Sequence, residues 1–282
     1  MTDPNRDIEQ FNDTDKAFKA FLTECIANPT LCPLTNHYKT ATEIETAFYT
    51  LLAQLRTQPL IVGPSIIDYS TLKNGALAFL KAPIGQATGF ATILDDLLTG
   101  NLSTAAADAL NAQIAAAGSL EDESLFGIRC TDKLARAKST GEMKGVMDRL
   151  YAVSKIAGSQ NGAMHYPCAQ WRFGSKGRYE GGWTGIKTRK PVLFIGNTYD
   201  PVTSVVSAFN ASAGFEGSVA LEQNGFGVCV FHYLLRFFSL LSLSLFFGTL
   251  SDKRLTTARL YCSTFQLHDQ CNSCILCRWH GT

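Results

Sequence analysis

The chain has 282 residues, and 46% of them are hydrophobic, which is enough for one large domain or two modest ones with a buried core. Its 25 basic residues nearly balance its 24 acidic ones, so the net charge is +1. This balance argues against nucleic acid or an anionic membrane surface as the main partner. The opening stretch MTDPNRDIEQFNDTDK has no apolar signal-peptide core. Either the protein is cytosolic or its true beginning lies upstream, and its localisation stays open.

Residues 8–157 carry apolar residues mainly at helical spacing and show little strand pattern. The clearest helix is TATEIETAFYTLLAQL, in which Thr42 and Glu45 have the spacing of a capping box. Its apolar face consists of Ile44, Phe48, Leu51, Leu52 and Leu55. Further helices are predicted for FATILDDLL, TAAADALNAQIAAAG and GEMKGVMDRLYAVSKIAG. Residues 1–157 are therefore expected to form one mainly helical region.

A long irregular connection is predicted for residues 158–189, which are rich in glycine and aromatic side chains. A β-α-β pattern follows. Val192–Ile195 is a short apolar run typical of a buried strand. Thr203 is placed to cap a helix that Gly214 ends, and Ser218–Glu222 predicts a second strand with NGFG as the turn after it.

Asp200 directly follows the first of these strands, in the stretch KPVLFIGNTYDPVT. Ligands of open parallel sheets bind at the carboxyl ends of the strands. A carboxylate there can orient a catalytic histidine through its Nδ1 proton, so Asp200 is the candidate catalytic residue. The alternative is that Asp200 only caps the turn before Pro201.

The stretch PVLFIGNTYDPVTSVVSAFNASAGFEGSVALEQNGFG resembles the C-terminal, TAP-like region of α/β-hydrolases related to tripeptidyl aminopeptidases, in the prolyl-aminopeptidase-like group. Upstream, GIRCTD and CAQWRF resemble the Ile-x-Cys-x-Asp and Cys-x-x-Trp stretches of that family. The resemblance implies a partial α/β-hydrolase fold, with a helical cap over residues 1–157. Residues 158–227 would form a connection and the last β-α-β unit of the parallel-sheet core.

The same resemblance implies a serine peptidase that needs no cofactor and releases residues or short peptides from free peptide N-termini. Its substrate partner would be a small peptide, and Asp200 would be the acid of a Ser-His-Asp triad. Two members of the triad are missing from the expected positions. No Gly-x-Ser-x-Gly nucleophile elbow occurs in the 282 residues. The family's Gly-His-Cys aligns with Gly227-Val228-Cys229, which puts Val228 at the base position.

We therefore expect the family's nucleophile half to be absent and this chain alone to be inactive. His232, four residues after Val228, is a weak substitute for the base. The other histidines match no family position and are expected on the surface or in loops: His37, His165, His268 and His280. Two alternatives are a non-catalytic peptide-binding remnant and a membrane-anchored protein that uses the apolar segment 228–250.

The composition changes after Gly227, so residues 228–282 are set apart as an atypical tail, which a mistranslated intron and an out-of-frame exon would explain. The run Phe237–Leu250 is too short to span a bilayer, which argues against the membrane alternative. The tail also contains Cys-x-x-Cys-x-x-Cys, and a fourth side chain of a metal-binding type lies nearby in the sequence. Metal or cluster ligands share this spacing, but the surrounding pattern is absent, so no metal site is predicted. The residues are Cys271, Cys274 and Cys277, with Cys262 or His280 as the fourth.

Four earlier cysteines could form two disulfides in an oxidising compartment. Cys25 and Cys32 flank a short loop, whereas Cys130 and Cys168 bracket the last helices of the cap and could tie it to the core. Buried free thiols are the alternative. Three glycosylation sequons agree weakly with the oxidising compartment, at Asn12, Asn101 and Asn210.

Overall fold

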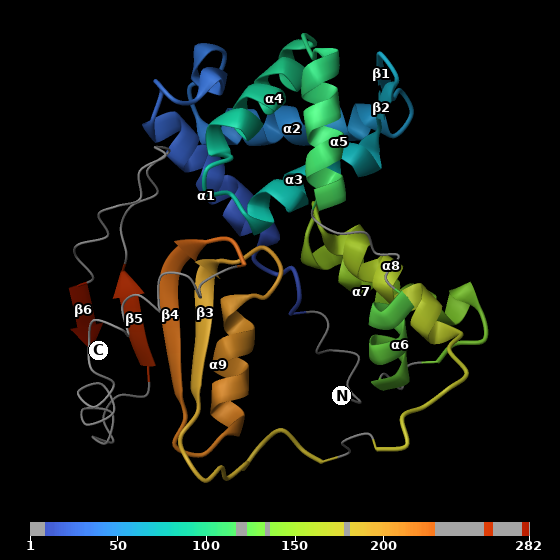
Figure 1. The fold of residues 1–282 in the computed structure, drawn as a ribbon, viewed down its shortest axis with the longest axis vertical. Coiled ribbons are helices and arrows are strands. Elements are labelled where there is room, and N and C mark those ends of the chain that lie inside the picture. Colours follow the sequence, from blue (N-terminus) through green and yellow to red (C-terminus); the bar gives the residue numbers. More distant parts are fainter. Residues whose placement is uncertain are drawn as a thin grey trace.

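The computed structural model describes residues 9–116, 123–132, 136–177 and 181–228, together with the backbone of two short strands at 257–261 and 278–281. Figure 1 shows one group of helices, α1 to α5, above a small sheet, and a second group, α6 to α8, beside it. Helix α9 covers one face of the sheet. The described chain is thus mostly helical with a small, largely parallel sheet.

The first helical group holds the main hydrophobic core. Phe79 and Phe90 stack with ring centroids 4.2 Å apart, and Phe21 packs edge-on against Phe79 at 4.7 Å. Phe18 and Phe48 join α1 to α2 with centroids 4.6 Å apart. The elements of this group are α1 Thr14–Ala27, the 3-10 turn η2 Pro33–Asn36, α2 Ala41–Leu55, β1 Leu60–Val62, β2 Ser65–Ile67, α3 Tyr69–Lys81, α4 Ala87–Thr99 and α5 Thr104–Ala116.

The predicted capping box of α2 was shifted by two residues. TATEIE contains the pattern Thr-x-x-Glu twice, and the structure uses the first copy, Thr40 and Glu43. The Glu43 amide donates to Thr40 Oγ1 at 3.2 Å, and the Thr40 amide donates to Glu43 Oε2 at 3.1 Å. Thr40 is extended, as a cap residue must be, whereas Thr42 already lies inside the helix.

The second helical group consists of α6 Glu123–Asp132, α7 Thr140–Val153 and α8 Gly158–Ala169. The irregular connection predicted for residues 158–189 was therefore wrong for its first part, where α8 lies. Its glycines serve helix packing: a Cβ on Gly158 would lie 2.6 Å from the Tyr151 carbonyl oxygen, and one on Gly162 would clash with Met147. Glycine at these positions lets α8 approach α7 closely.

Both predicted cysteine pairs form disulfides. Cys25–Cys32 closes the loop between α1 and η2, with Cα atoms 5.3 Å apart. Cys130–Cys168 joins α6 to α8, with Cα atoms 4.5 Å apart. The bond therefore joins the region before residue 158 to the region after it, as the sequence predicted, and it does so within the second helical group.

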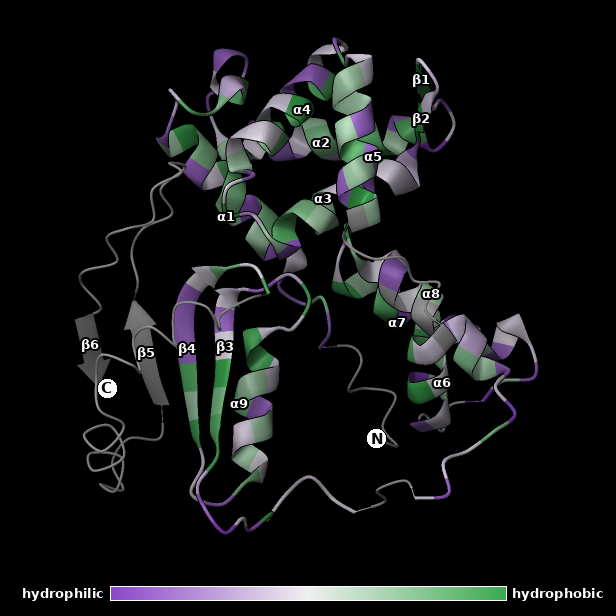
Figure 2. Cartoon of the chain, viewed as in Figure 1, coloured by the Kyte–Doolittle hydropathy of each residue, from purple (hydrophilic) through white to green (hydrophobic). Residues whose placement is uncertain are grey.

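The sheet has the strand order β3-β4-β5-β6, in which β3, β4 and β5 are parallel and β6 is antiparallel to β5. Strand β4 includes the first three residues of the predicted NGFG turn and ends at Phe226, and Ser204 rather than Thr203 caps α9. Figure 2 shows β3 and β4 as hydrophobic near their starts and hydrophilic toward their carboxyl ends. The bounds are β3 Leu193–Tyr199, α9 Val205–Gly214, β4 Val219–Phe226, β5 Thr257–Tyr261 and β6 Arg278–Gly281.

Several features predicted for the tail fall outside the described residues. These are most of the apolar segment 228–250, His232, His268 and the cysteines at 262, 271, 274 and 277. Over the ranges that are described, no helix is long and apolar enough to cross a membrane, and no three metal-ligating side chains cluster.

Candidate functional site

Asp200 lies one residue beyond the carboxyl end of β3 and is buried, with 5% of its surface exposed. Its Oδ1 accepts hydrogen bonds from the amides of Val202 at 2.9 Å and Thr203 at 2.8 Å. One carboxylate oxygen therefore caps the turn before the helix, as the structural alternative predicts. No described residue donates to the other oxygen, Oδ2, which leaves it able to accept from a further group.

Burial raises the pKa of Asp200 by penalising its charged form. The two backbone hydrogen bonds oppose this shift, and the nearby Asp13 carboxylate adds to it, so the pKa lies above its usual value. Asp200 is thus a carboxyl group whose charged form is held by amide donors rather than by a neighbouring cation.

A segment from the start of the chain, Gln10–Thr14, holds the Asp200 turn in place; we call it the N-terminal clamp. Gln10 forms an antiparallel bridge with Thr203, and the Phe11 amide donates to the Val202 carbonyl at 3.0 Å. The Thr14 hydroxyl donates to the Pro201 carbonyl at 2.5 Å. Phe11 has a φ of 67°, an unusual backbone conformation for this residue type.

Asp13, within the clamp, accepts hydrogen bonds from groups at the start of α9. Its Oδ2 accepts from the Ser204 hydroxyl at 2.6 Å and from the Val205 amide at 3.2 Å. Asp13 has 6% of its surface exposed. A buried carboxylate at a helix N-terminus is stabilised by free amides and by the helix dipole. The sequence analysis missed this residue, because nothing local in the sequence links it to a turn some 190 positions away.

Val228, the position expected for the catalytic base, follows the strand that neighbours the one carrying Asp200. Strands β3 and β4 pair in parallel with Tyr199 opposite Phe226, and the Gly227 amide donates to the Tyr199 carbonyl at 3.2 Å. Residues 200 and 228 therefore follow neighbouring strand ends, which are about 5 Å apart in a sheet. Val228 is partly exposed, with 38% of its surface accessible.

Gly227 fixes the direction of the chain at the end of β4. It has a φ of +87°, and a Cβ there would lie 2.9 Å from the Lys81 carbonyl oxygen. The Val228 amide donates to the same Lys81 carbonyl at 3.0 Å, and Asn197 Nδ2 donates to the Gly227 carbonyl at 2.8 Å. The end of α3 thereby positions residue 228.

The described histidines do not complete the site. His165 is buried in α8, contrary to the expected surface position, because its face of the helix is turned inward. His37 is half-exposed, with Nε2 3.9 Å from Asp95 Oδ1. Neither is hydrogen-bonded or ion-paired to Asp200. The backbone of His280 pairs with Arg259 between β6 and β5. Within the described residues, Asp200 thus has no histidine partner.

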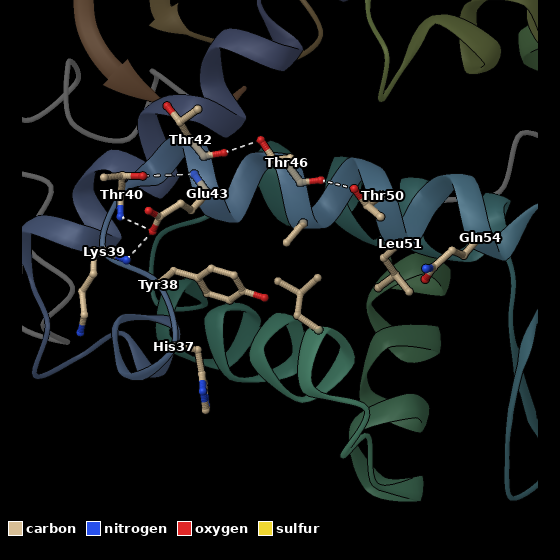
Figure 3. Close-up of a pocket in the computed structure, with 12 residues that line it drawn as sticks. His37, Tyr38, Lys39, Thr40, Thr42, Glu43, Thr46, Thr50, Leu51 and Gln54 are labelled. Atoms are coloured by element: carbon tan, nitrogen blue, oxygen red, sulfur yellow. Dashed lines mark hydrogen bonds between the residues drawn. The ribbon is translucent and has the colours of Figure 1, made fainter.

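A groove of about 740 Å³ lies along α2, in the first helical group (Figure 3). Two of its hydroxyls are already bonded within the helix: that of Thr46 donates to the Thr42 carbonyl and that of Thr50 to the Thr46 carbonyl, both at 2.8 Å. Glu43 is used in the capping box. The groove therefore offers a surface for binding but no nucleophile paired with a base.

Comparison with known families identifies the part of the chain that holds Asp200. Residues 154–233 match the family model described as TAP-like protein. The chain thus carries an α/β-hydrolase TAP-like C-terminal domain, and the resemblance inferred from the sequence is confirmed. The match covers α8, β3, α9 and β4 and continues past Val228. No curated protein matches the chain.

Proposed function

We propose that this TAP-like domain derives from a serine exopeptidase acting on short peptides, with Asp200 in the place of the triad acid. We further propose that this polypeptide alone does not hydrolyse peptides. The observation that carries the proposal is the parallel register of β3 and β4, which brings Asp200 and a valine at the base position, Val228, to neighbouring strand ends. An acid and a base of a catalytic triad need this adjacency.

The chemistry at these two positions is incomplete. A triad aspartate holds the histidine tautomer and stabilises the imidazolium, and Asp200 Oδ2 is available for that contact. The valine side chain at 228 has no atom that can accept a proton from a serine hydroxyl. The chain also has no Gly-x-Ser-x-Gly sequence to present such a serine. Loss of the nucleophile or the base from a triad lowers kcat by about 10⁶-fold.

Two assays on the purified full chain test the proposal. A fluorophosphonate probe labels activated serines, and fluorogenic aminoacyl and tripeptidyl amides report N-terminal cleavage. We expect neither labelling nor turnover above buffer, with an active serine peptidase as the positive control. Labelling that a single serine-to-alanine substitution abolishes would overturn the proposed inactivity.

The groove along α2 favours a non-catalytic peptide-binding function as the second candidate. It is open, and the Thr46 and Thr50 hydroxyls that line it are hydrogen-bonded within α2 rather than paired with a base. Saturable binding of a short peptide without cleavage, weakened by Leu51→Glu in the groove, would support this candidate. Binding that Leu51→Glu leaves unchanged would exclude the groove as the binding surface.

A further inference from the structure

Two cations converge on one phenol at the junction of the two helical groups. Lys73, on α3, donates from Nζ to the Tyr69 hydroxyl oxygen at 3.1 Å and to Ser159 Oγ, on α8, at 3.0 Å. Arg56, just after α2, donates from Nη2 to the same Tyr69 oxygen at 3.1 Å. We call Arg56, Tyr69, Lys73 and Ser159 the cation cluster. Arg56 and Lys73 both donate to the Tyr69 oxygen, and Lys73 also links α3 to Ser159 on α8.

The cluster holds positive charge without a negative partner among the described residues. Neither Arg56 nor Lys73 forms an ion pair with a carboxylate there. Lys73 has only 4% of its surface exposed, and a buried ammonium is costly unless it is paired. The aromatic ring supplies part of the compensation, since Arg56 Cζ lies 4.6 Å and Lys73 Nζ 4.8 Å from its centroid.

Donors also outnumber acceptors in the cluster. An ammonium has three donors and a guanidinium five, and Lys73 and Arg56 use two and one of them within the described residues. The Tyr69 and Ser159 hydroxyl protons have no acceptor among these residues. A negatively charged group with several acceptor oxygens would satisfy the unused donors of the cation cluster.

The state of Tyr69 points in the same direction. Burial alone would raise the pKa of its hydroxyl, but the hydrogen bonds and charges of Arg56 and Lys73 lower it overall. The field at the phenol oxygen therefore favours negative charge. Any other anion placed beside Arg56 and Lys73 experiences the same field.

The cluster is open to solvent on one side. Arg56 and Ser159 are exposed, Tyr69 is partly exposed, and Lys73 lies beneath them. An entering anion would meet the guanidinium and the serine hydroxyl first and the ammonium below. Asn74 and Gln160, the neighbours of Lys73 and Ser159, are hydrogen-bonded to each other and hold α3 against α8.

We propose that Arg56, Lys73 and Ser159 form a binding site for an oxyanion, a carboxylate or phosphate group of a small molecule, with Tyr69 as the shared platform for the two cations. The site lies where α3 and the end of α2 meet α8, and it uses none of the residues around Asp200. The proposal is therefore independent of the proposed hydrolase ancestry.

Isothermal titration of the full chain with inorganic phosphate and with acetate, at an ionic strength fixed with sodium chloride, tests the site. We expect saturable binding of at least one anion. Arg56→Gln and Lys73→Met should each weaken it by about tenfold or more, because each removes a charge-assisted hydrogen bond. The matched control is Lys155→Met, which removes an exposed lysine lying over the Tyr49 ring, 4.7 Å from its centroid.

The two anions separate the possible ligands: binding of phosphate alone indicates a phosphate-bearing ligand, and binding of acetate indicates a carboxylate. Should Lys73→Met fail to fold, Arg56→Gln still decides, because Arg56 is exposed. The absence of saturable binding by either anion would overturn the proposal. Equal weakening by Arg56→Gln and Lys155→Met would also overturn it and indicate an adventitious ion only.

Discussion

Ser204 donates a 2.6 Å hydrogen bond to Asp13, joining the start of α9 to the N-terminal clamp across 191 positions of sequence. Asp200 lies in the turn between β3 and this helix. The clamp residues contact all four residues between Asp200 and α9, which are Pro201, Val202, Thr203 and Ser204. The beginning of the described chain thus holds the turn that presents the candidate catalytic carboxylate.

Asp13→Ala should destabilise the fold by about 1–3 kcal/mol, because it leaves the Ser204 hydroxyl and the Val205 amide buried without an acceptor. Asp13→Asn should cost less, since it keeps one acceptor oxygen. Urea unfolding measures both free energies. Asp148→Ala, at an exposed pair with Lys144, is the control and should change stability by less than about 0.5 kcal/mol. Equal effects of Asp13→Ala and Asp148→Ala would contradict the clamp.

Asp200 should make stability depend on pH. Burial raises its folded-state pKa above the unfolded value of about 3.9, so the folded state binds the proton more tightly. This contribution is fully present below the unfolded pKa and is lost as the pH rises through the folded pKa. In the isosteric variant Asp200→Asn, the amide side chain does not titrate. Its stability relative to wild type should therefore increase as the pH rises from acid toward neutral. Urea unfolding of both proteins across this range checks the sign, and a relative stability that falls with pH would contradict the raised pKa.

The two disulfides should contribute unequally to stability. Cys130 and Cys168 are 38 residues apart, whereas Cys25 and Cys32 are separated by 7. Loop-closure entropy then predicts that losing the longer bridge costs about 1.5 kcal/mol more than losing the shorter one. Urea unfolding of Cys130→Ala/Cys168→Ala and Cys25→Ala/Cys32→Ala compares them. Intact mass after alkylation without reductant first establishes that both bonds form, and four alkylated thiols at these positions would refute the pairing.

Gly227→Ala should destabilise the chain by about 1–3 kcal/mol, because its positive φ and its contact with the Lys81 carbonyl leave no room for a Cβ. Gly89→Ala is the matched control in α4, where a Cβ would meet nothing within 4 Å. That change should stabilise by up to about 1 kcal/mol, from helix propensity. Thermal unfolding distinguishes the two, and a neutral Gly227→Ala would show that residue 228 is not positioned in this way.

The sequence predicted the elements whose signals are local. The apolar face of α2, the strand before Asp200 and the helix after it were all expected from periodicity and turn residues, although the apolar residues 192–195 of the strand are only partly buried. Gly158 and Gly162 were misinterpreted as loop residues, because only their neighbours on α7 show that they serve helix packing. The Asp13–Ser204 contact was invisible for the same reason: it depends on tertiary structure, and neither residue has an unusual local context.

An imidazole introduced at position 228 tests the central claim, that this position lies beside the Asp200 carboxylate. The experiment is an NMR pH titration of the introduced ring in Val228→His and in the double variant Val228→His/Asp200→Asn. A carboxylate within about 4–6 Å should raise the imidazole pKa by about one unit or more above 6.5 in the single variant. The pKa should return toward 6.5 in the double variant. Equal pKa values in the two proteins would contradict the placement of residues 200 and 228 as the acid and base positions of a triad.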